Sequence, residues 1–282
     1  RPGSEPPLAE LNESRTAMMR ELFRYDRVVC STERQRADIG ALLGPVPNVV
    51  VIPPATDPVT PGPAPREAGR GAVLASLIER KRIDDIVRAV ARARALAPDA
   101  DIRLDVYGSG EAEPELRRLI AEEGLDGIVE LRGYRQGARE VFATASWTAL
   151  TSTHEGFGMA LAEAMSGGCV PFAYRIPYGP SDLLATTPDH LVAPGAVDDL
   201  AERIAAFVTS PEDAREALRE RVEEEARKYA PEHVSAAWRR LVAELDAALP
   251  ESDPRAAEPK SRALRIRRTP AGIEIEADFG LH

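Results

Sequence analysis

Two glutamates flank a glycine turn in the stretch TSTHEGFGMALAE, residues 151–163. Glu155 stands at the start of the Gly-Phe-Gly turn, and Glu163 follows eight positions later in an otherwise apolar helical run. A buried helix carries an unpaired carboxylate only at a large cost in free energy. Glu163 is therefore expected to meet either solvent or a ligand.

The backbone of this turn suits a phosphate group. Glycine lets the chain approach a ligand closely, and the first amides of a helix point at an anion bound there. These amides belong to Phe157, Gly158 and Met159. Lys81, in the stretch SLIERKR (residues 76–82), would add a positive charge to the same group.

The two carboxylates complete the predicted site. Helical side chains lean toward the helix N-terminus, so Glu163 can reach back toward the same ligand. A carboxylate there accepts hydrogen bonds from two vicinal hydroxyls, such as those of a ribose. Glu155 would face the group that the diphosphate carries. The residues thus predict a nucleotide-diphosphate site with a polyhydroxylated group at each end.

Strands alternating with helices must position these residues. The hydrophobic pattern predicts strands at 72–78, 102–108, 128–133, 147–152, 169–174 and 190–194, with helices between them and at 197–208. This alternation predicts an α/β fold, a Rossmann-like parallel sheet with helices on both faces. Ligands of such sheets bind beyond the carboxyl ends of the strands, near the switch point in strand order. The segments 76–82, 131–137 and 152–163 each follow a strand.

The rest of the chain is organised around this unit. Residues 1–52 are predicted to be a remnant of another Rossmann domain, and 53–67 a Pro/Gly-rich extended linker. The Rossmann-like domain is expected over 68–249. The tail, 250–282, contains alternating residues on both sides of a Pro-Gly turn, which predicts a β-hairpin appendage.

Composition narrows the classes of function. The chain has 282 residues, 44% of them hydrophobic, and a net charge of −10, which argues against nucleic acid or anionic membrane as a partner. Cys30 and Cys169 lie in apolar runs and are expected to be buried thiols, without a disulfide or a zinc site. No apolar run reaches the roughly 18 residues of a membrane helix, and the first residues lack a signal pattern. A cytoplasmic enzyme or binding protein is expected.

The stretch EGFGMALAE, residues 155–163, is an E-x7-E motif. It resembles the C-terminal donor-binding domain of retaining GT-B glycosyltransferases of family 4, and residues 107–134 resemble that family's approach to the site. The phrase YGPSDLL, residues 178–184, resembles the subgroup that acts on poly(glycerol-phosphate) and similar wall polymers or on serine-rich proteins. The resemblance covers about residues 68–249, with a weaker trace over 20–55.

The resemblance implies transfer of a hexose from a nucleotide sugar, commonly a UDP-sugar, with retention of configuration and without metal or cofactor. By position, Glu163 matches the residue that binds the ribose diol, and Glu155 the residue that contacts the donor sugar. Lys81 matches the lysine that stabilises the departing diphosphate. Tyr134 and Arg135 fall where the nucleobase is usually held.

Two departures from the family matter. Ser76 stands five residues before Lys81, where the family usually carries an arginine, so Arg80 or Arg82 would have to compensate. Residues 27–52 resemble only the last strand, helix and exit of the family's N-terminal acceptor domain. An acceptor domain or a partner subunit is therefore expected, with a wall polymer, a glycan or a protein as acceptor, and this chain alone is expected to present a donor without completing a transfer.

Alternatives remain open at this stage. The chain could be a non-catalytic subunit that binds a nucleotide sugar or stabilises a partner, or it could catalyse another GT-B reaction such as epimerisation, which YGPSDLL does not favour. Both glutamates and Lys81 could be solvated surface charges. His154 could act in catalysis, Tyr178, Gly179 and Pro180 could line the donor pocket, and Gly108 and Gly110 could bind phosphate. Each of these residues also has a plain structural explanation, as a packing or turn residue.

Overall fold

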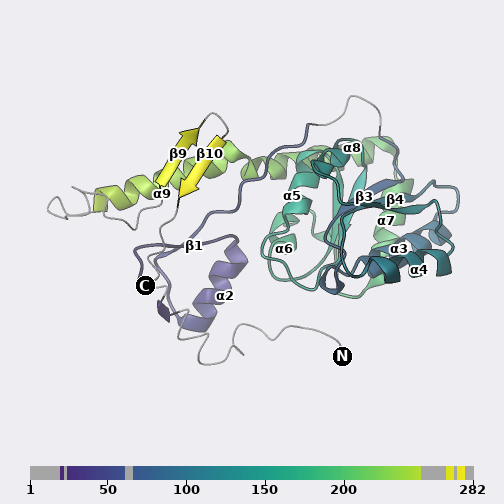
Figure 1. The fold of residues 1–282 in the computed structure, drawn as a ribbon, viewed down its shortest axis with the longest axis horizontal. Helices are drawn as coiled ribbons and strands as arrows, with labels where there is room; N and C mark the ends of the chain where they lie inside the picture. The colour runs from purple at the N-terminus through teal and green to yellow at the C-terminus, as the bar shows by residue number, and fades with distance from the viewer. Residues whose placement is uncertain (1–19, 22–23, 61–65, 249–264, 270–271, 277–282) are drawn as a thin grey trace. The chain divides into compact units, whose positions relative to one another are not determined.

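The computed structural model describes residues 20–21, 24–60, 66–248, 265–269 and 272–276 (Figure 1). The chain divides into two units, Arg1–Ala237 and Trp238–His282. Among the described residues, no helix is long and apolar enough to cross a membrane.

A six-stranded parallel sheet forms the centre of the first unit. Its strands lie in the order β5-β4-β3-β6-β7-β8. The strand of this sheet that comes first along the chain, β3, is therefore next to the one that comes fourth, β6. This is the strand order of the Rossmann fold, with its switch point between β3 and β6. The predicted fold class is confirmed. The strands are β3 (Arg70–Leu74), β4 (Arg103–Tyr107), β5 (Val129–Gly133), β6 (Trp147–Leu150), β7 (Val170–Tyr174) and β8 (Leu191–Val192).

Helices cover the sheet in two groups (Figure 1). The helices α3 (Ile83–Leu96), α4 (Glu113–Glu122) and α7 (Val197–Thr209) pack together, and α5 (Met159–Ser166) packs with α8 (Glu212–Ala226). The helix expected between the strands predicted at 128–133 and 147–152 is instead a short 3₁₀ helix, which follows a left-handed Gly137. The other short helices are η2 (Glu79–Lys81), α6 (Pro180–Leu183), η3 (Ala138–Ala143), η4 (Pro188–His190) and η5 (Arg227–Tyr229).

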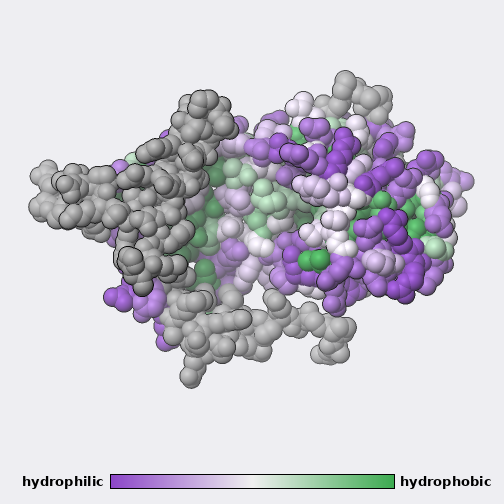
Figure 2. Space-filling view, in the orientation of Figure 1, coloured by the Kyte–Doolittle hydropathy of each residue, from purple (hydrophilic) through white to green (hydrophobic). Residues whose placement is uncertain are grey.

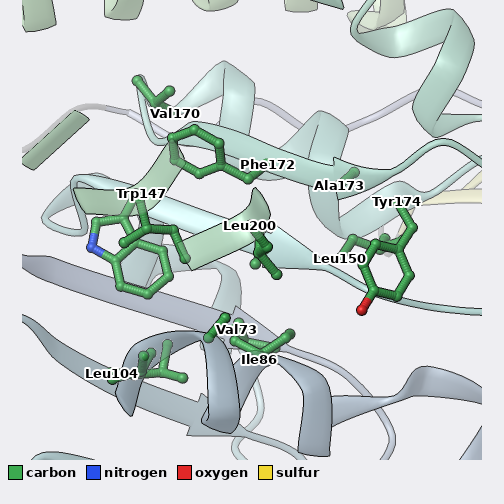
Figure 3. Packing of buried hydrophobic residues seen from close by; sticks show 14 of the residues in the cluster. Val73, Ile86, Leu104, Trp147, Leu150, Val170, Phe172, Ala173, Tyr174 and Leu200 are labelled. Carbon is green, nitrogen blue, oxygen red and sulfur yellow. The ribbon is translucent and has the colours of Figure 1, made fainter. Parts of the chain in front are cut away.

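The core lies between the sheet and these helices (Figure 3). Trp147, Phe172 and Leu104 of the strands are fully buried, and α3 contributes Ile86 to the same cluster. Burying side chains of this size stabilises a domain by roughly 1.5–3 kcal/mol each relative to their exposed state. The outer surface of the sheet-and-helix domain, on the side that is seen, carries mainly hydrophilic residues (Figure 2). The strands β6 and β7 are buried along their whole length, as expected of a parallel sheet that is covered on both faces, and the carboxyl edge of this sheet carries the candidate site.

Residues 52–60 have no helix or strand, yet they are packed against the domain. The side chains of Thr56 and Val59 are buried, and the Val59 amide donates to Ser166 Oγ at 3.0 Å. Val59 also joins a small cluster with Phe142 and Cys169. This segment, which we call the strap (residues 52–60), is therefore anchored to the domain, whereas the sequence indicated an extended linker there.

Arg66 continues the anchoring beyond the strap. Its guanidinium donates to the backbone oxygen of Phe142 at 2.9 Å, and also to the carbonyls of Ala145 and Gly167. Burial lowers the pKa of this guanidinium. Because carbonyls of two chain segments converge on one side chain, Arg66 ties the entry of β3 to the turns after η3 and α5.

A smaller β-α-β segment precedes the strap. β1 (Val28–Cys30) and β2 (Val49–Val51) pair in parallel, with α2 (Glu33–Leu43) between them. Thr32 caps α2 by accepting a hydrogen bond from the Gln35 amide at 3.1 Å. Both cysteines are free, but only Cys169 is fully buried, and Cys30 is partly exposed, so the expected burial is wrong for Cys30.

The C-terminal part adds the helix α9 (Pro231–Ala248) and a strand pair. β9 (Arg265–Thr269) and β10 (Gly272–Glu276) pair in antiparallel register. The turn residues between them and the flanking tail lie outside the described residues, so the hairpin appendage stays a prediction, as does the predicted division of the chain into four segments.

Candidate functional site

An ion pair joins the two strands of the switch point. Lys81 follows β3 and Glu155 follows β6, and Lys81 Nζ lies 2.5 Å from Glu155 Oε1. The side chains are only 18% and 11% exposed, respectively. Ser152 Oγ donates to the same Glu155 oxygen at 2.7 Å. These contacts oppose the interpretation of Lys81 and Glu155 as solvated surface charges.

Hydrogen bonds from the loop that follows β6 hold the turn that carries Lys81. Thr151 Oγ1 lies 3.1 Å from the Lys81 oxygen and 2.7 Å from the Arg82 oxygen. The Thr153 amide donates to the Arg80 oxygen at 2.9 Å. Because Lys81 belongs to the turn η2 rather than to α3, its backbone depends on these contacts for its position.

Two glycines shape the turn before α5. Gly158 has a φ of 91° and begins the helix in a left-handed conformation that other residues rarely adopt. Gly179 approaches the turn so closely that a Cβ atom on it would lie 1.7 Å from the oxygen of Phe157. Only glycine fits at Gly179, and the YGPSDLL segment is thereby held directly against the EGFG turn.

We call the space beside the ion pair the inner pocket. It has a volume of about 250 Å³ and is lined by Lys81, Ser152, Glu155, Phe157, Gly158, Met159 and neighbouring residues of β3 and β6. Among the described residues, the amides of 156–159 donate no hydrogen bond within the protein. Free amides beside a lysine provide a binding site for an anion.

A second space, the outer cleft, lies on the β4–β5 side. It has a volume of about 630 Å³ and shares Leu74 and Ala75, at the end of β3, with the inner pocket. Its other lining residues include Ser76, Gly108, Tyr134, Arg135, Arg139, Glu140 and Glu163. Tyr134 is 79% exposed, although it is a large aromatic residue. The two spaces adjoin, so one elongated ligand can occupy both.

Glu163 lies in the outer cleft, partly buried. Burial raises the pKa of its carboxyl, Arg139 opposes this rise, and Asp57 of the strap adds to it. Arg139 itself donates to Asp57 at 2.8 Å. Sequence reasoning missed Arg139 and Asp57; the only available signal was that Arg139 follows the β5 loop already carrying Tyr134 and Arg135.

The candidates for replacing the missing arginine are placed differently. Ser76 is exposed and lines the outer cleft. The Arg82 guanidinium pairs with Asp84 at 3.4 Å and Asp85 at 2.9 Å, and Arg82 lines neither space. Arg80 instead donates to the His154 oxygen at 2.9 Å and lies 3.9 Å from Glu155. Of the two arginines, Arg80 is the one next to the site.

Other predicted residues surround the turn. His154 Nδ1 lies 3.1 Å from Thr153 Oγ1, and the Tyr178 amide donates to the Glu155 oxygen at 3.3 Å. Asp38 of α2 hydrogen-bonds the Tyr178 hydroxyl and, with burial as the larger cause, raises the pKa of Tyr178 to about 12. A Cβ on Gly108 would lie 1.8 Å from the Ala75 oxygen, which supports the turn interpretation of that glycine.

Metal-dependent glycosyltransferases use a D-x-D triplet, and this chain has one, Asp99-Ala100-Asp101, directly before β4. It lies at the amino end of that strand, whereas Lys81 and Glu155 lie at the carboxyl edge. Asp101 pairs with Arg103 at 2.9 Å. Within the described part of the chain, no group of three or more His, Cys, Asp and Glu side chains is arranged to hold a metal ion.

Residues 71–229 match the family described as glycosyl transferases group 1. The match covers more than half of the chain, and the chain belongs to this family. The resemblance noted for the E-x7-E motif is thereby confirmed at the level of the family, and the fold is that of GT-B glycosyltransferases.

Curated relatives carry several activities. An exopolysaccharide phosphotransferase of Streptomyces coelicolor is 32% identical over 226 residues, which is 78% of this chain and 23% of the relative. The GtfA subunit of a UDP-N-acetylglucosamine–peptide N-acetylglucosaminyltransferase of Streptococcus gordonii is 28% identical over 206 residues, 71% of this chain and 40% of the relative. The chain therefore spans less than half the length of these relatives.

A solved structure shares the fold. The pneumococcal O-GlcNAc transferase GtfA, in complex with UDP and GlcNAc, superimposes with a TM-score of 0.70 at 24% identity, over 81% of this chain and 47% of that chain. At this identity the similarity establishes the architecture. The roles of individual residues depend on the geometry described above.

Proposed function

We propose that this chain supplies the donor site of a retaining hexosyltransferase that uses a nucleotide diphosphate sugar of the UDP class, with the pyrimidine end of the donor against Tyr134. The observation that carries the proposal is the largely buried Lys81–Glu155 pair at the switch point, which lines the inner pocket beside amides that have no partner among the described residues. The S. gordonii relative, whose name includes a UDP-sugar, supports the choice of donor.

The two spaces fit the two ends of such a donor. In the proposed arrangement the base stacks on the exposed ring of Tyr134, with Arg135 beside it, and the Glu163 carboxylate accepts from the ribose diol. The diphosphate lies against the amides of Phe157, Gly158 and Met159, with Lys81 as its counter-charge.

The proposed chemistry requires stabilisation of the departing diphosphate. Negative charge grows on the leaving group as the sugar–phosphate bond breaks, and Lys81 with the helix amides would stabilise it. Glu155 would contact the sugar hydroxyls from the other side of the ion pair. We propose that this site needs no metal or other cofactor, because Lys81 and the amides supply the positive charge themselves.

Calorimetry with UDP and several UDP-sugars tests the donor site. We expect binding by the unaltered chain and binding about 10- to 100-fold weaker in Lys81→Met, with the charge-matched surface variant Lys228→Met unaffected. Lys228 makes a similar ion pair, 2.6 Å from Glu225, in a different part of the unit. Absence of UDP binding by the unaltered chain would overturn the proposal.

A second candidate function is that of a non-catalytic subunit that binds a nucleotide sugar or stabilises a partner. Ser76 favours it, because the outer cleft has a hydroxyl where the family usually carries a phosphate-binding guanidinium. The S. gordonii relative is itself named as a subunit. Binding of UDP-sugar without transfer or hydrolysis, in the presence of the acceptor-binding part, would favour this candidate.

The acceptor and the setting also belong to the proposal. An acceptor domain or a partner subunit would bring a wall polymer, a glycan or a protein to the sugar end of the inner pocket. We place the protein in the cytoplasm, and the two free cysteines support a reducing compartment.

A further inference from the structure

The helix α2 contacts the EGFG turn through one side chain. Gln35 Nε2 donates to the Gly156 oxygen at 3.0 Å, across a sequence separation of 121 residues. At its other end the same amide accepts, through Oε1, a hydrogen bond from the Ser31 amide at 2.8 Å. The Ser31 N–H can only donate and the Gly156 oxygen can only accept, so the two contacts together define which end of the Gln35 amide is which.

The carbonyl that Gln35 holds belongs to a functional peptide unit. A trans peptide is planar, so its oxygen and the following N–H point in opposite directions. Holding the Gly156 oxygen toward α2 therefore turns the Phe157 N–H away from α2. Phe157 lines the inner pocket, and its amide has no partner among the described residues of the protein.

The neighbouring peptide units of the turn are held in a similar way. The Glu155 oxygen accepts from the Tyr178 amide at 3.3 Å, and the Phe157 oxygen lies where a Cβ on Gly179 would be. Hydrogen bonds from outside the turn thus hold two successive carbonyls, those of Glu155 and Gly156, and Gly179 packs closely against the third. Of the groups that hold them, only Gln35 is a side chain, so a substitution can remove it without changing the backbone.

The position of α2 is supported independently of Gln35. Asp182, from YGPSDLL, lies 3.9 Å from the Arg34 guanidinium at the start of α2, and Arg34 and Thr32 oppose the rise that burial causes in the pKa of its carboxyl. At the next turn of the helix, Asp38 bonds Tyr178. A carboxylate is favoured at a helix N-terminus, so these contacts keep α2 seated on the loop when Gln35 is replaced.

We propose that Gln35 is a positioning residue for the donor diphosphate: by holding the Gly156 carbonyl, it presents the Phe157 amide to the phosphate oxygens in the inner pocket. The inference rests on the proposed donor function and adds to it a residue of the small β-α-β segment. It makes the affinity for the diphosphate, and not for the nucleoside, dependent on α2.

Two substitutions of Gln35 test this by different routes. Gln35→Met removes the donor without adding charge. Gln35→Glu keeps the acceptor that receives the Ser31 amide, and with it the helix cap, but replaces the donor with an oxygen that faces the Gly156 carbonyl. We expect both to weaken UDP binding by about 3- to 10-fold, the value of one hydrogen bond.

Controls separate positioning from charge and from folding. Arg36→Gln alters the net charge by the same amount as Gln35→Glu and lies on the same helix. Among the described residues, Arg36 forms an ion pair only with Glu33, at the surface, so its replacement should leave the affinity for UDP unchanged. Uridine, which lacks the diphosphate, should bind every variant equally, as measured by ligand-observed NMR. The midpoint of thermal unfolding of Gln35→Glu should stay within about 2 °C of the unaltered chain.

The outcomes distinguish this inference from the donor function itself. No binding of UDP to the unaltered chain would overturn the proposed function. Normal UDP binding by the unaltered chain and by both Gln35 variants would overturn only the role of Gln35. An equal loss of affinity for UDP and uridine would also overturn it, because the effect would then be a general change in the fold.

Discussion

The inner pocket and the outer cleft differ in how their polar groups are held. In the inner pocket, Lys81 and Glu155 are paired at 2.5 Å, largely buried, and braced by hydroxyls of the loop that follows β6. In the outer cleft, Tyr134 is 79% exposed and Ser76 is exposed as well. The inner pocket is preorganised by the protein, whereas the aromatic face of the outer cleft is left for a ligand to cover.

This difference suggests how the two regions would contribute to binding. Preorganised charges interact strongly with a ligand because they need little rearrangement, and partial burial weakens the screening by water. An exposed ring gains free energy by being covered, in proportion to the area removed from water. Substitutions in the inner pocket should therefore have larger effects, and these should depend on the phosphate groups.

The largest effect is expected from Lys81→Met. It removes the counter-charge of the diphosphate and leaves the largely buried Glu155 with only the more distant Arg80 as an ion-pair partner among the described residues. We expect UDP to bind about 10- to 100-fold more weakly, the value of a charge-assisted hydrogen bond, and uridine to bind as before. Calorimetry would measure both, with Lys228→Met as the control. A loss equal for UDP and uridine would break the proposed division between the two regions.

A smaller effect is expected from Glu163→Gln in the outer cleft. The amide keeps one acceptor oxygen, so UDP affinity should fall by about 10-fold or less. The loss should nearly disappear when the ligand is 2′-deoxy-UDP, because the diol is then absent. Glu140→Gln, which changes another acid of the same cleft, is the control. Equal losses for both ligands would place the ribose elsewhere.

Tyr134→Ala should have a more modest effect on UDP. Loss of one stacking contact costs about 1 kcal/mol, or roughly 5-fold in affinity, and here it should affect uridine and UDP alike. The unfolding midpoint should not change, because the side chain is exposed. Tyr25→Ala removes another exposed tyrosine, 66% exposed, and should alter neither quantity. An effect confined to UDP would move the phosphates toward Tyr134.

The smallest effect concerns pH. The pKa of Glu163 is raised in the folded protein, chiefly by burial, so the native state holds this proton more tightly than the unfolded state. Its contribution to stability is therefore present at low pH and is lost as pH rises through the folded pKa. Glu163→Gln should remove this decline, so that the variant is at least as stable as the unaltered chain at pH 7 in urea unfolding.

The opposite result in urea unfolding would also be informative about Glu163. If Glu163→Gln were less stable at pH 7, the attraction of Arg139 would outweigh the burial of the carboxylate. In UDP titrations, affinity should fall as pH is lowered through the pKa of Glu163, because the protonated carboxyl accepts fewer hydrogen bonds. Glu140→Gln should leave that pH dependence in place.

Local patterns were sufficient to predict the sheet and part of the site. Ile83, Ile86, Val87 and Val90 recur at helical spacing, and all four are buried in α3. The meeting of Lys81 and Glu155 followed from the general property of doubly wound sheets, since each residue comes directly after a strand. Such predictions succeed because the spacing of residues along the chain determines which side of an element they occupy.

Other features depend on contacts between distant segments, which periodicity does not encode. Arg82 and Lys81 are adjacent in sequence, but Arg82 adopts a left-handed φ of 49° and pairs with Asp85, away from the inner pocket. Gln35 reads in the sequence as one polar residue of a helix, and its partner Gly156 is far along the chain. A charged or polar side chain on a turn has several reachable partners, and only the folded arrangement selects one.

The strap has a practical consequence for dividing the chain into fragments. A fragment that starts at residue 68 would lack Val59, whose side chain packs so closely on Gly167 that a Cβ there would lie 3.0 Å from it. It would also lack Arg66, whose guanidinium donates to the Phe142 oxygen. It would expose Phe142 and leave backbone oxygens without their donor. A shortened protein should therefore start at residue 52 or earlier.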